Sequence, residues 1–241
     1  MNAPILYIPL AIEWVILITA LMPRLLVGMF YNVPRFALTL WFTYFISSVL
    51  AAAAAIVITF WALLELLQYS ADTKLLAGEV GSQLGLWLMV AVSGVAIALV
   101  NLRTEPLVQE ASVATQALAA TAKPLGVFQK VQLYEVAFPA PLAFATKISS
   151  KPAIVISNSA LASMGKAEIE AIYWHELGHI RGRHNLLKSV ARLVALLTPN
   201  FRASKFFRLE TDHLVELTAD NFAKKHVSEK TLRSAREKFL E

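Results

Sequence analysis

The sequence predicts an α-helical membrane domain with three spans, residues 1–102, followed by a water-exposed α+β domain, residues 103–241, with a small β-sheet. Two observations support this prediction. Of the 241 residues, 57% are hydrophobic and 16% are charged, whereas soluble domains carry about 25% charged residues. The charges are also unevenly placed, since residues 1–102 hold three of the 22 basic and four of the 17 acidic residues. The first part of the chain is therefore apolar and the second is basic.

Three apolar stretches reach the roughly 20 residues that an α-helix needs to cross a bilayer. They are residues 3–22, 36–64 and 84–102. Glu13 is the only charged residue in the first stretch, and the other two carry none. A carboxylate inside a span is a candidate functional residue. The alternative is that Glu13 faces a neighbouring helix or reaches outward to the interface.

Basic residues in the short loops predict the orientation, because they concentrate on the cytoplasmic side of membrane proteins. Arg24 and Arg35 lie between the first two spans, and Arg103 follows the third. We therefore expect a multi-pass protein of the cell membrane, with its N-terminus outside and residues 103–241 in the cytoplasm. The basic surplus fits a lipid bilayer as partner, and no nucleic-acid motif accompanies it. The chain has no cysteine, which excludes disulfides and a thiol nucleophile.

The second part begins with an alanine- and leucine-rich segment, residues 105–122, that predicts a helix ending at Pro124 and Gly126. Residues 127–136 alternate apolar and polar side chains and predict a strand. A turn over residues 138–144 leads into a second short strand, and residues 152–157 form a third. The next turn begins at Asn158 or Ser159. Further helices are predicted from about Lys166 through His179, over residues 186–197, over residues 208–225 and at the C-terminus.

The helix predicted from Lys166 carries HELGH at residues 175–179. Because His175 and His179 are four residues apart, both imidazoles lie on one helical face, where their nitrogens can converge on one Zn²⁺. The carboxylate of Glu176 can reach a water on that metal, whose pKa zinc lowers to about 7. Glu176 is therefore the predicted general base and acid. The alternative, a surface helix with two incidental histidines, is weakened by a carboxylate further along the chain.

That carboxylate lies in the segment ELTAD, residues 216–220. Catalytic zinc takes three protein ligands and keeps one open position, and Glu216 can supply the third. Asp220 lies one turn further on the same face and can accept a hydrogen bond from the outer nitrogen of a zinc-bound histidine. Taken alone, Glu216 would fit an exposed helical acid equally well. With the histidine pair upstream, we expect His175, His179 and Glu216 to bind Zn²⁺.

HELGH followed by ELTAD resembles the gluzincin pattern HExxH…ExxAD, and the likeness extends from about residue 137 to 223. Two groups of membrane metallopeptidases share this pattern. One holds the heat-shock quality-control peptidases and the CAAX prenyl proteases, and the other holds the beta-lactam-sensing receptor proteases. The resemblance implies a zincin-like metallopeptidase domain. It also implies that His175, His179 and Glu216 bind zinc, that Glu176 is the general base and that Asp220 supports a ligand.

The remaining histidines fit this pattern less directly. A metzincin, HExxHxxGxxH, would need a histidine one residue after His184, although Gly182 is in place. We therefore expect His184 either behind the metal or on the surface. His213 lies three residues before Glu216, where relatives often place a basic residue. It is predicted either to stabilise the oxyanion or to be an exposed polar residue, and His226 is expected on the surface.

Three spans before a cytoplasmic domain resemble the receptor-protease group more than the quality-control group. Members of that group normally add a fourth span and a penicillin-binding sensor domain, and neither is found here, so direct beta-lactam sensing is not expected. We expect a membrane-bound zinc metalloendopeptidase that cleaves a protein substrate, such as a cytoplasmic transcriptional repressor, at the cytoplasmic face. A free edge of strand 153–157 would hold the substrate backbone, unless this is an ordinary core strand.

Three other functions remain open. The first is a quality-control peptidase for membrane proteins. The second is a non-catalytic zinc-binding membrane receptor, although a structural zinc site has no use for a base at Glu176. The third is a metal transporter, which would place its site within the spans, whereas all five histidines follow Arg103.

Overall fold

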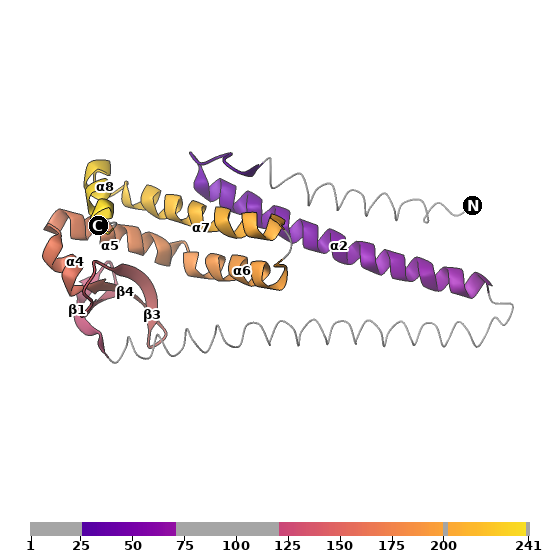
Figure 1. The fold of residues 1–241 in the computed structure, drawn as a ribbon, viewed down its shortest axis with the longest axis horizontal. Coiled ribbons are helices and arrows are strands. Elements are labelled where there is room, and N and C mark those ends of the chain that lie inside the picture. The colour runs from indigo at the N-terminus through magenta and orange to yellow at the C-terminus, as the bar shows by residue number, and fades with distance from the viewer. Residues whose placement is uncertain (1–25, 71–120, 200–201, 240–241) are drawn as a thin grey trace.

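The computed structural model describes residues 26–70, 121–199 and 202–239. One long helix, α2 (Pro34–Ser70), lies beside an α+β unit and continues well beyond it (Figure 1). The strands of that unit are β1 (Lys123–Phe128), β2 (Val131–Val136), β3 (Ala143–Ile148) and β4 (Lys151–Ser157). Its helices are α4 (Asn158–Ser163), α5 (Lys166–Arg181), α6 (His184–Leu197), α7 (Arg202–Ala223) and α8 (Glu229–Glu237).

The sheet has the order β1-β2-β4-β3, with β2 parallel to β4 and the other two pairs antiparallel. The prediction of one strand over residues 127–136 is wrong, because the chain reverses at Gln129 and Lys130, both at positive φ. Two such residues make the tight turn that suits a β-hairpin. Pro124 and Gly126, predicted to end a helix, lie in β1 instead, and Gly126 has a φ of +155° beside a register shift. The helix predicted over residues 105–122 lies almost entirely outside the described residues.

Strand β4 lies inside the sheet, paired with both β2 and β3. Its residues 153–156 are β-branched or small and fully buried, as an internal strand requires. The expectation that this strand offers a free edge is therefore wrong. The edge that lies beside α5 belongs to β3.

The sheet packs against α5 through a core that includes Leu133 and Ile154 from the strands and Ile172 and Leu177 from the helix. The turn expected at residues 158–159 is a short helix, α4, which is capped by the Ser157 hydroxyl as it accepts a hydrogen bond from the Ala160 N–H. Helix α5 covers the segment predicted from Lys166, and α6 covers the predicted stretch 186–197. Both predictions are confirmed.

Helices α5 and α7 approach each other closely at Gly178. A Cβ atom there would lie 3.1 Å from the Cα atom of Ala219, so a larger side chain would push the helices apart. Helix α7 begins at Arg202 rather than at residue 208 and ends at Ala223. The close approach sets the distance between the HELGH segment on α5 and the ELTAD segment on α7.

Helix α2 contains all of the second predicted span, residues 36–64, as one helix of 37 residues. It packs on α7 through Trp41, Phe42 and Phe45, whose rings surround Phe207. Across the described residues, no helix combines the length and apolarity needed to cross a membrane. The other two predicted spans and Glu13 lie outside the described residues, so the three-span domain stays a prediction.

Candidate active site

The structure brings together three predicted metal ligands from two helices. The Nε2 atoms of His175 and His179 on α5 lie 3.1 Å apart. One carboxylate oxygen of Glu216 on α7, Oε2, lies 3.4 Å from the first and 3.5 Å from the second. Both histidines are buried and Glu216 is partly buried. Residues from distant parts of the sequence therefore present three donor atoms to one point.

These distances fit a zinc ion. Zinc lies about 2.0–2.2 Å from nitrogen and oxygen ligands in tetrahedral sites, which separates neighbouring ligand atoms by roughly 3.3–3.5 Å. The three measured separations, 3.1, 3.4 and 3.5 Å, lie close to that range. Two histidine nitrogens that face each other in a buried site also need a cation or a shared proton between them. His175, His179 and Glu216 can therefore hold a metal ion.

The outer nitrogen of His175 faces the other predicted carboxylate. Its Nδ1 atom lies 2.8 Å from Oδ1 of Asp220, a close contact that is not aligned as an ideal hydrogen bond. Burial lowers the pKa of His175, but Asp220 and Glu216 outweigh this and raise it to about 9. Proton placement on Nδ1 leaves the Nε2 lone pair free for a metal, which is the arrangement that Asp220 was predicted to support.

Helix α6 supplies two further contacts to the ligands. The Nδ1 atom of His184 lies 3.0 Å from Nδ1 of His179, and Lys188 donates to Oε1 of Glu216 at 2.8 Å. Burial raises the pKa of Glu216, but hydrogen bonds from His175, His179 and Lys188 outweigh this and hold it well below its ordinary value. Burial, with the charges of His179 and Lys188, lowers the pKa of His184 to about 4.

Lys188 was missed by sequence reasoning. The only available signal was its place one turn after His184, and that signal had no meaning until the fold of α6 was known. Of the two expected positions for His184, behind the metal or on the surface, the structure agrees with the first. His184 is buried behind His179 and is not among the grouped ligand atoms.

The predicted base, Glu176, is buried beside the ligands, with 8% of its surface exposed. Burial raises the pKa of its carboxyl group, whereas the neighbouring histidines and a hydrogen bond from the Ala145 backbone lower it, with a net increase. A carboxylate with a raised pKa takes up and releases a proton more readily near neutral pH. Its position therefore fits proton transfer next to the metal ligands.

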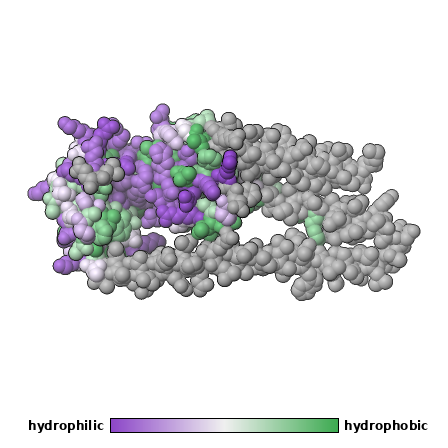
Figure 2. All heavy atoms as spheres, in the orientation of Figure 1, coloured by the Kyte–Doolittle hydropathy of each residue, from purple (hydrophilic) through white to green (hydrophobic). Residues whose placement is uncertain are grey.

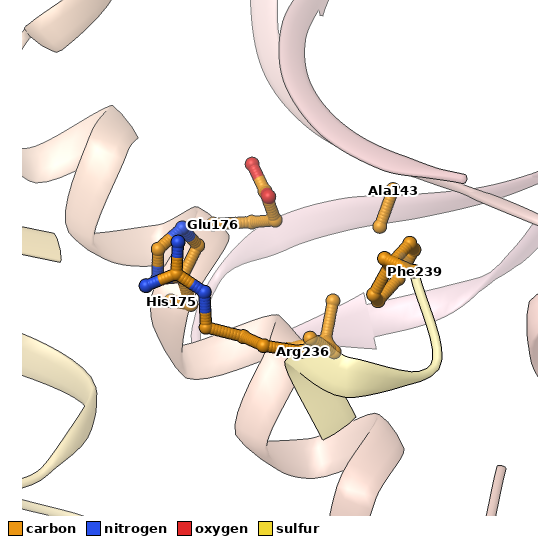
Figure 3. Close-up of a pocket in the computed structure, with 6 residues that line it drawn as sticks. Ala143, His175, Glu176, Arg236 and Phe239 are labelled. Carbon is orange, nitrogen blue, oxygen red and sulfur yellow. The ribbon is translucent and has the colours of Figure 1, made fainter. Parts of the chain in front are cut away.

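Glu176 and His175 line a pocket of about 280 Å³. Figure 3 shows these two side chains on α5 together with Arg236 and Phe239 from the C-terminal segment and Ala143 from β3, and the carboxylate of Glu176 points away from Arg236. The pocket combines apolar walls with the charged groups, as substrate sites commonly do. The participation of residues 236–239 was not foreseen, because the sequence predicts only a charged helix there.

The C-terminal segment is tied to the site by ion pairs. Arg236 donates to Oδ2 of Asp220, and Lys238 lies 2.6 Å from Oε2 of Glu168 at the start of α5. The Ser234 hydroxyl donates to the same carboxylate at 2.6 Å. These hydrogen bonds, of which the one from Lys238 has the largest effect, lower the pKa of Glu168 to about 2. The wall of the pocket formed by α8 is therefore fixed to α5 and α7.

Two other histidines lie away from the pocket. The exposed ring of His213 packs edge-on against Tyr31, with centroids 4.8 Å apart. It is not among the residues that line the pocket, and its predicted action on the oxyanion stays a prediction. His226 is exposed, as expected, and stacks on Trp174 at 3.6 Å.

The family comparison agrees with this site. The model of peptidase family M48 matches residues 107–211, a stretch that includes His175, Glu176 and His179 and ends before Glu216. The match supports a gluzincin metallopeptidase, and peptidases of this family are zinc-dependent. The match does not confirm the more specific resemblance to the beta-lactam-sensing receptor proteases. A comparison with curated proteins finds no match.

Proposed function

We propose that this chain is a membrane-bound zinc metalloendopeptidase that hydrolyses peptide bonds of a protein substrate at the cytoplasmic face. The observation that carries this proposal is the convergence of three ligand atoms, from His175, His179 and Glu216, beside the buried carboxylate of Glu176. A structural zinc site would have no use for that carboxylate.

The chain's own residues divide the chemistry between them. Zinc held by the three ligands would supply a Lewis acid for the scissile carbonyl and for the attacking water. Glu176 takes one proton from that water as its oxygen attacks the carbonyl carbon. The same carboxyl group then delivers the proton to the leaving amine nitrogen as the carbon–nitrogen bond breaks. The raised pKa of Glu176 favours the first of these transfers, the uptake of the proton from water.

The substrate class is inferred from the edge of β3. The Ser157 N–H donates to the carbonyl of Leu142, so Leu142 turns its backbone groups toward β4. In an antiparallel pair the direction alternates along the strand, so Ala143 and Ala145 turn their backbone groups toward the open edge of the sheet. The Ala145 carbonyl accepts from Asn185, and Ala145 also hydrogen-bonds Glu176. Ala143 lines the pocket, so an extended peptide can pair with β3 there and place its next bond near Glu176.

The membrane location is supported by helix α2 and by the uncharged sequence of residues 36–64. Large apolar side chains are exposed along this helix, among them Ile46, Leu50 and Trp61, with 55%, 64% and 70% of their surfaces exposed. Side chains of this kind fit a lipid environment. Over α7 and α8, by contrast, hydrophilic residues predominate on the face shown in Figure 2. The basic residues Arg24, Arg35 and Arg103 support the proposed cytoplasmic side, because basic residues concentrate on that side of membrane proteins.

The biological role is proposed to be regulatory, with a cytoplasmic transcriptional repressor as one substrate of the expected kind. A quality-control role would instead act on damaged membrane proteins. The two differ in their substrates, because a regulatory peptidase cuts few sequences and a quality-control peptidase cuts many. A cleavage profile therefore separates them.

The proposal is tested on the full chain purified in detergent. We would incubate it with a proteome-derived peptide mixture, with and without a zinc chelator, and identify the products by mass spectrometry. We expect cleavage that the chelator abolishes and that Glu176→Gln strongly reduces while zinc stays bound. Glu170→Gln is the matched control, since Glu170 is an exposed glutamate on the same helix. Zinc binding without cleavage in the unaltered chain would support the non-catalytic receptor instead.

A further inference from the structure

We propose that α6 is the positioning helix of the metal centre. His184 and Lys188, one turn apart on α6, hold the outer atoms of two of the three metal-binding residues and so set the affinity for zinc. This inference rests on the proposed zinc site. It concerns residues that neither the HELGH nor the ELTAD segment contains.

The first contact fixes the ring of His179. If Nε2 of His179 faces the metal, its Nδ1 atom carries the proton and donates to Nδ1 of His184, 3.0 Å away. His184 must then accept at Nδ1 and carry its own proton on Nε2. Only 1% of the His184 surface is exposed, so water does not compete for this hydrogen bond. The two histidines thus adopt one tautomer each, and the metal-facing nitrogen of His179 is fixed.

The turn between α5 and α6 is shaped to make this contact. Arg183 adopts a left-handed conformation, with a φ of 51°, which separates α5 from α6, and the ring of His184 then contacts His179 on α5. Gly182 leaves room for the ring, because a Cβ atom there would lie 2.1 Å from Nε2 of His184 and 2.4 Å from its Cδ2. A buried ring cannot move aside cheaply, so the absence of a side chain at Gly182 is a requirement of this arrangement.

The second contact orients Glu216. Lys188 binds Oε1 at 2.8 Å, while Oε2 faces His175 and His179 at 3.4 and 3.5 Å. One oxygen is therefore held by a cation and the other is presented to the metal. The Glu216 side chain is 34% exposed, and without Lys188 its carboxylate would be free to rotate toward water. A charge-assisted hydrogen bond is short and directional enough to prevent this.

Helix α6 is itself held in place. Its residues Leu187, Ala191 and Val194 pack in the same cluster as Phe207 of α7 and Trp41 of α2. A ligand partner on a packed helix stays within a few tenths of an ångström of its place, which a partner on a loop does not. Loss of such outer partners typically weakens metal binding about 10–100-fold.

The test is a zinc titration of the full chain in detergent, in competition with a chromophoric chelator. We expect the Kd for zinc to rise about 10–100-fold in His184→Leu, Lys188→Met and Gly182→Ala. His184→Asn keeps a hydrogen-bond acceptor bonded to Cγ, the amide Oδ1, and Lys188→Arg keeps the positive charge. Both variants should therefore retain most of the zinc affinity of the unaltered chain. Arg192→Met is the matched control, because it removes an exposed cation from the same helix.

Thermal unfolding of the zinc-free variants separates positioning from a general contribution to the fold. If the residues were merely structural, the Tm of the zinc-free protein would fall while the Kd stayed within about twofold of the unaltered chain. That result, or no recovery in the conservative variants, would overturn the inference. If His184→Leu does not fold, the partly exposed Lys188 and its two variants decide. A failure of the unaltered chain to bind zinc would instead overturn the proposed function.

Discussion

His175 and Asp220 face each other across the α5–α7 contact, with Nδ1 of the histidine 2.8 Å from Oδ1 of the carboxylate. The other oxygen of Asp220 accepts from Arg236 of α8. One carboxylate therefore joins a metal-binding residue to the wall of the pocket. The C-terminal segment and the metal site are thus parts of one polar network.

Asp220→Asn tests this network. The amide is neutral and can present its NH₂ group to the imidazole, so it holds the protonated Nδ1 of His175 less well. We expect zinc affinity to fall about 10–100-fold, measured by chelator competition. Asp212→Asn, on the same helix about two turns earlier, should leave zinc affinity unchanged. Equal affinities in Asp220→Asn and the unaltered chain would remove Asp220 from the metal site.

Glu176→Gln separates metal binding from proton transfer. The amide cannot take a proton from water, so we expect kcat/KM for a cleaved peptide to fall about 10²–10⁴-fold. Zinc content should stay at the level of the unaltered chain, because Glu176 is not among the ligand atoms. Retained activity in this variant would mean that another group transfers the proton.

Gly178→Val tests the close approach of α5 and α7. A Cβ atom at this position would lie 3.1 Å from Cα of Ala219 and 3.3 Å from its carbonyl oxygen, so valine must separate the helices. We expect a loss of about 1–3 kcal/mol in the free energy of unfolding and weaker zinc binding, because Glu216 and Asp220 move with α7. Gly165→Ala, where the added atom meets only ordinary contacts, serves as the control and should change neither quantity.

The ion pair between Glu168 and Lys238 predicts a pH dependence of stability. The pKa of Glu168 is lowered to about 2 in the folded chain, against about 4.3 when unfolded. A lowered pKa stabilises the fold fully above about pH 5, and this contribution is lost as the pH falls toward 2. We therefore expect Glu168→Gln to lower the Tm at pH 7, with a deficit that shrinks steadily below pH 5.

The matched control for this measurement is Glu237→Gln, an exposed glutamate on α8. Its Tm should follow that of the unaltered chain across the same pH range. A Tm deficit in Glu168→Gln that stays constant from pH 7 to pH 3 would show that the carboxylate acts through packing and not through its charge.

The grouping of His175, His179 and Glu216 was largely predictable from the sequence, because each of the two motifs that contribute to it is local. The spacing of His175 and His179 fixes a common helical face, and the structure places the carboxylates of the ELTAD segment beside it. The features that could not be predicted, the β-hairpin and the contact of Lys188 with Glu216, depend on the conformation of turns. Two positive-φ residues at 129–130 split one expected strand into a hairpin, and the turn at Gly182–Arg183 brings Lys188 to Glu216.

The pattern of apolar residues also could not predict the order of the strands within the sheet. A run such as residues 153–157 has the same composition at an edge or in the centre, and only the pairing with β2 and β3 puts it inside. The pocket wall formed by Arg236 and Phe239 depends on the packing of the chain's end against α5. No local pattern encodes that contact.

Zinc-edge X-ray absorption on the full chain, loaded with one equivalent of zinc, tests the central claim most directly. We expect one zinc per chain, with scattering from two imidazoles at about 2.0–2.1 Å and from oxygen ligands at about 2.0–2.2 Å. Glu216→Ala should lose affinity and change the oxygen shell, while the imidazole scattering remains. A spectrum with one imidazole or none, or an oxygen shell indifferent to Glu216, would contradict the account.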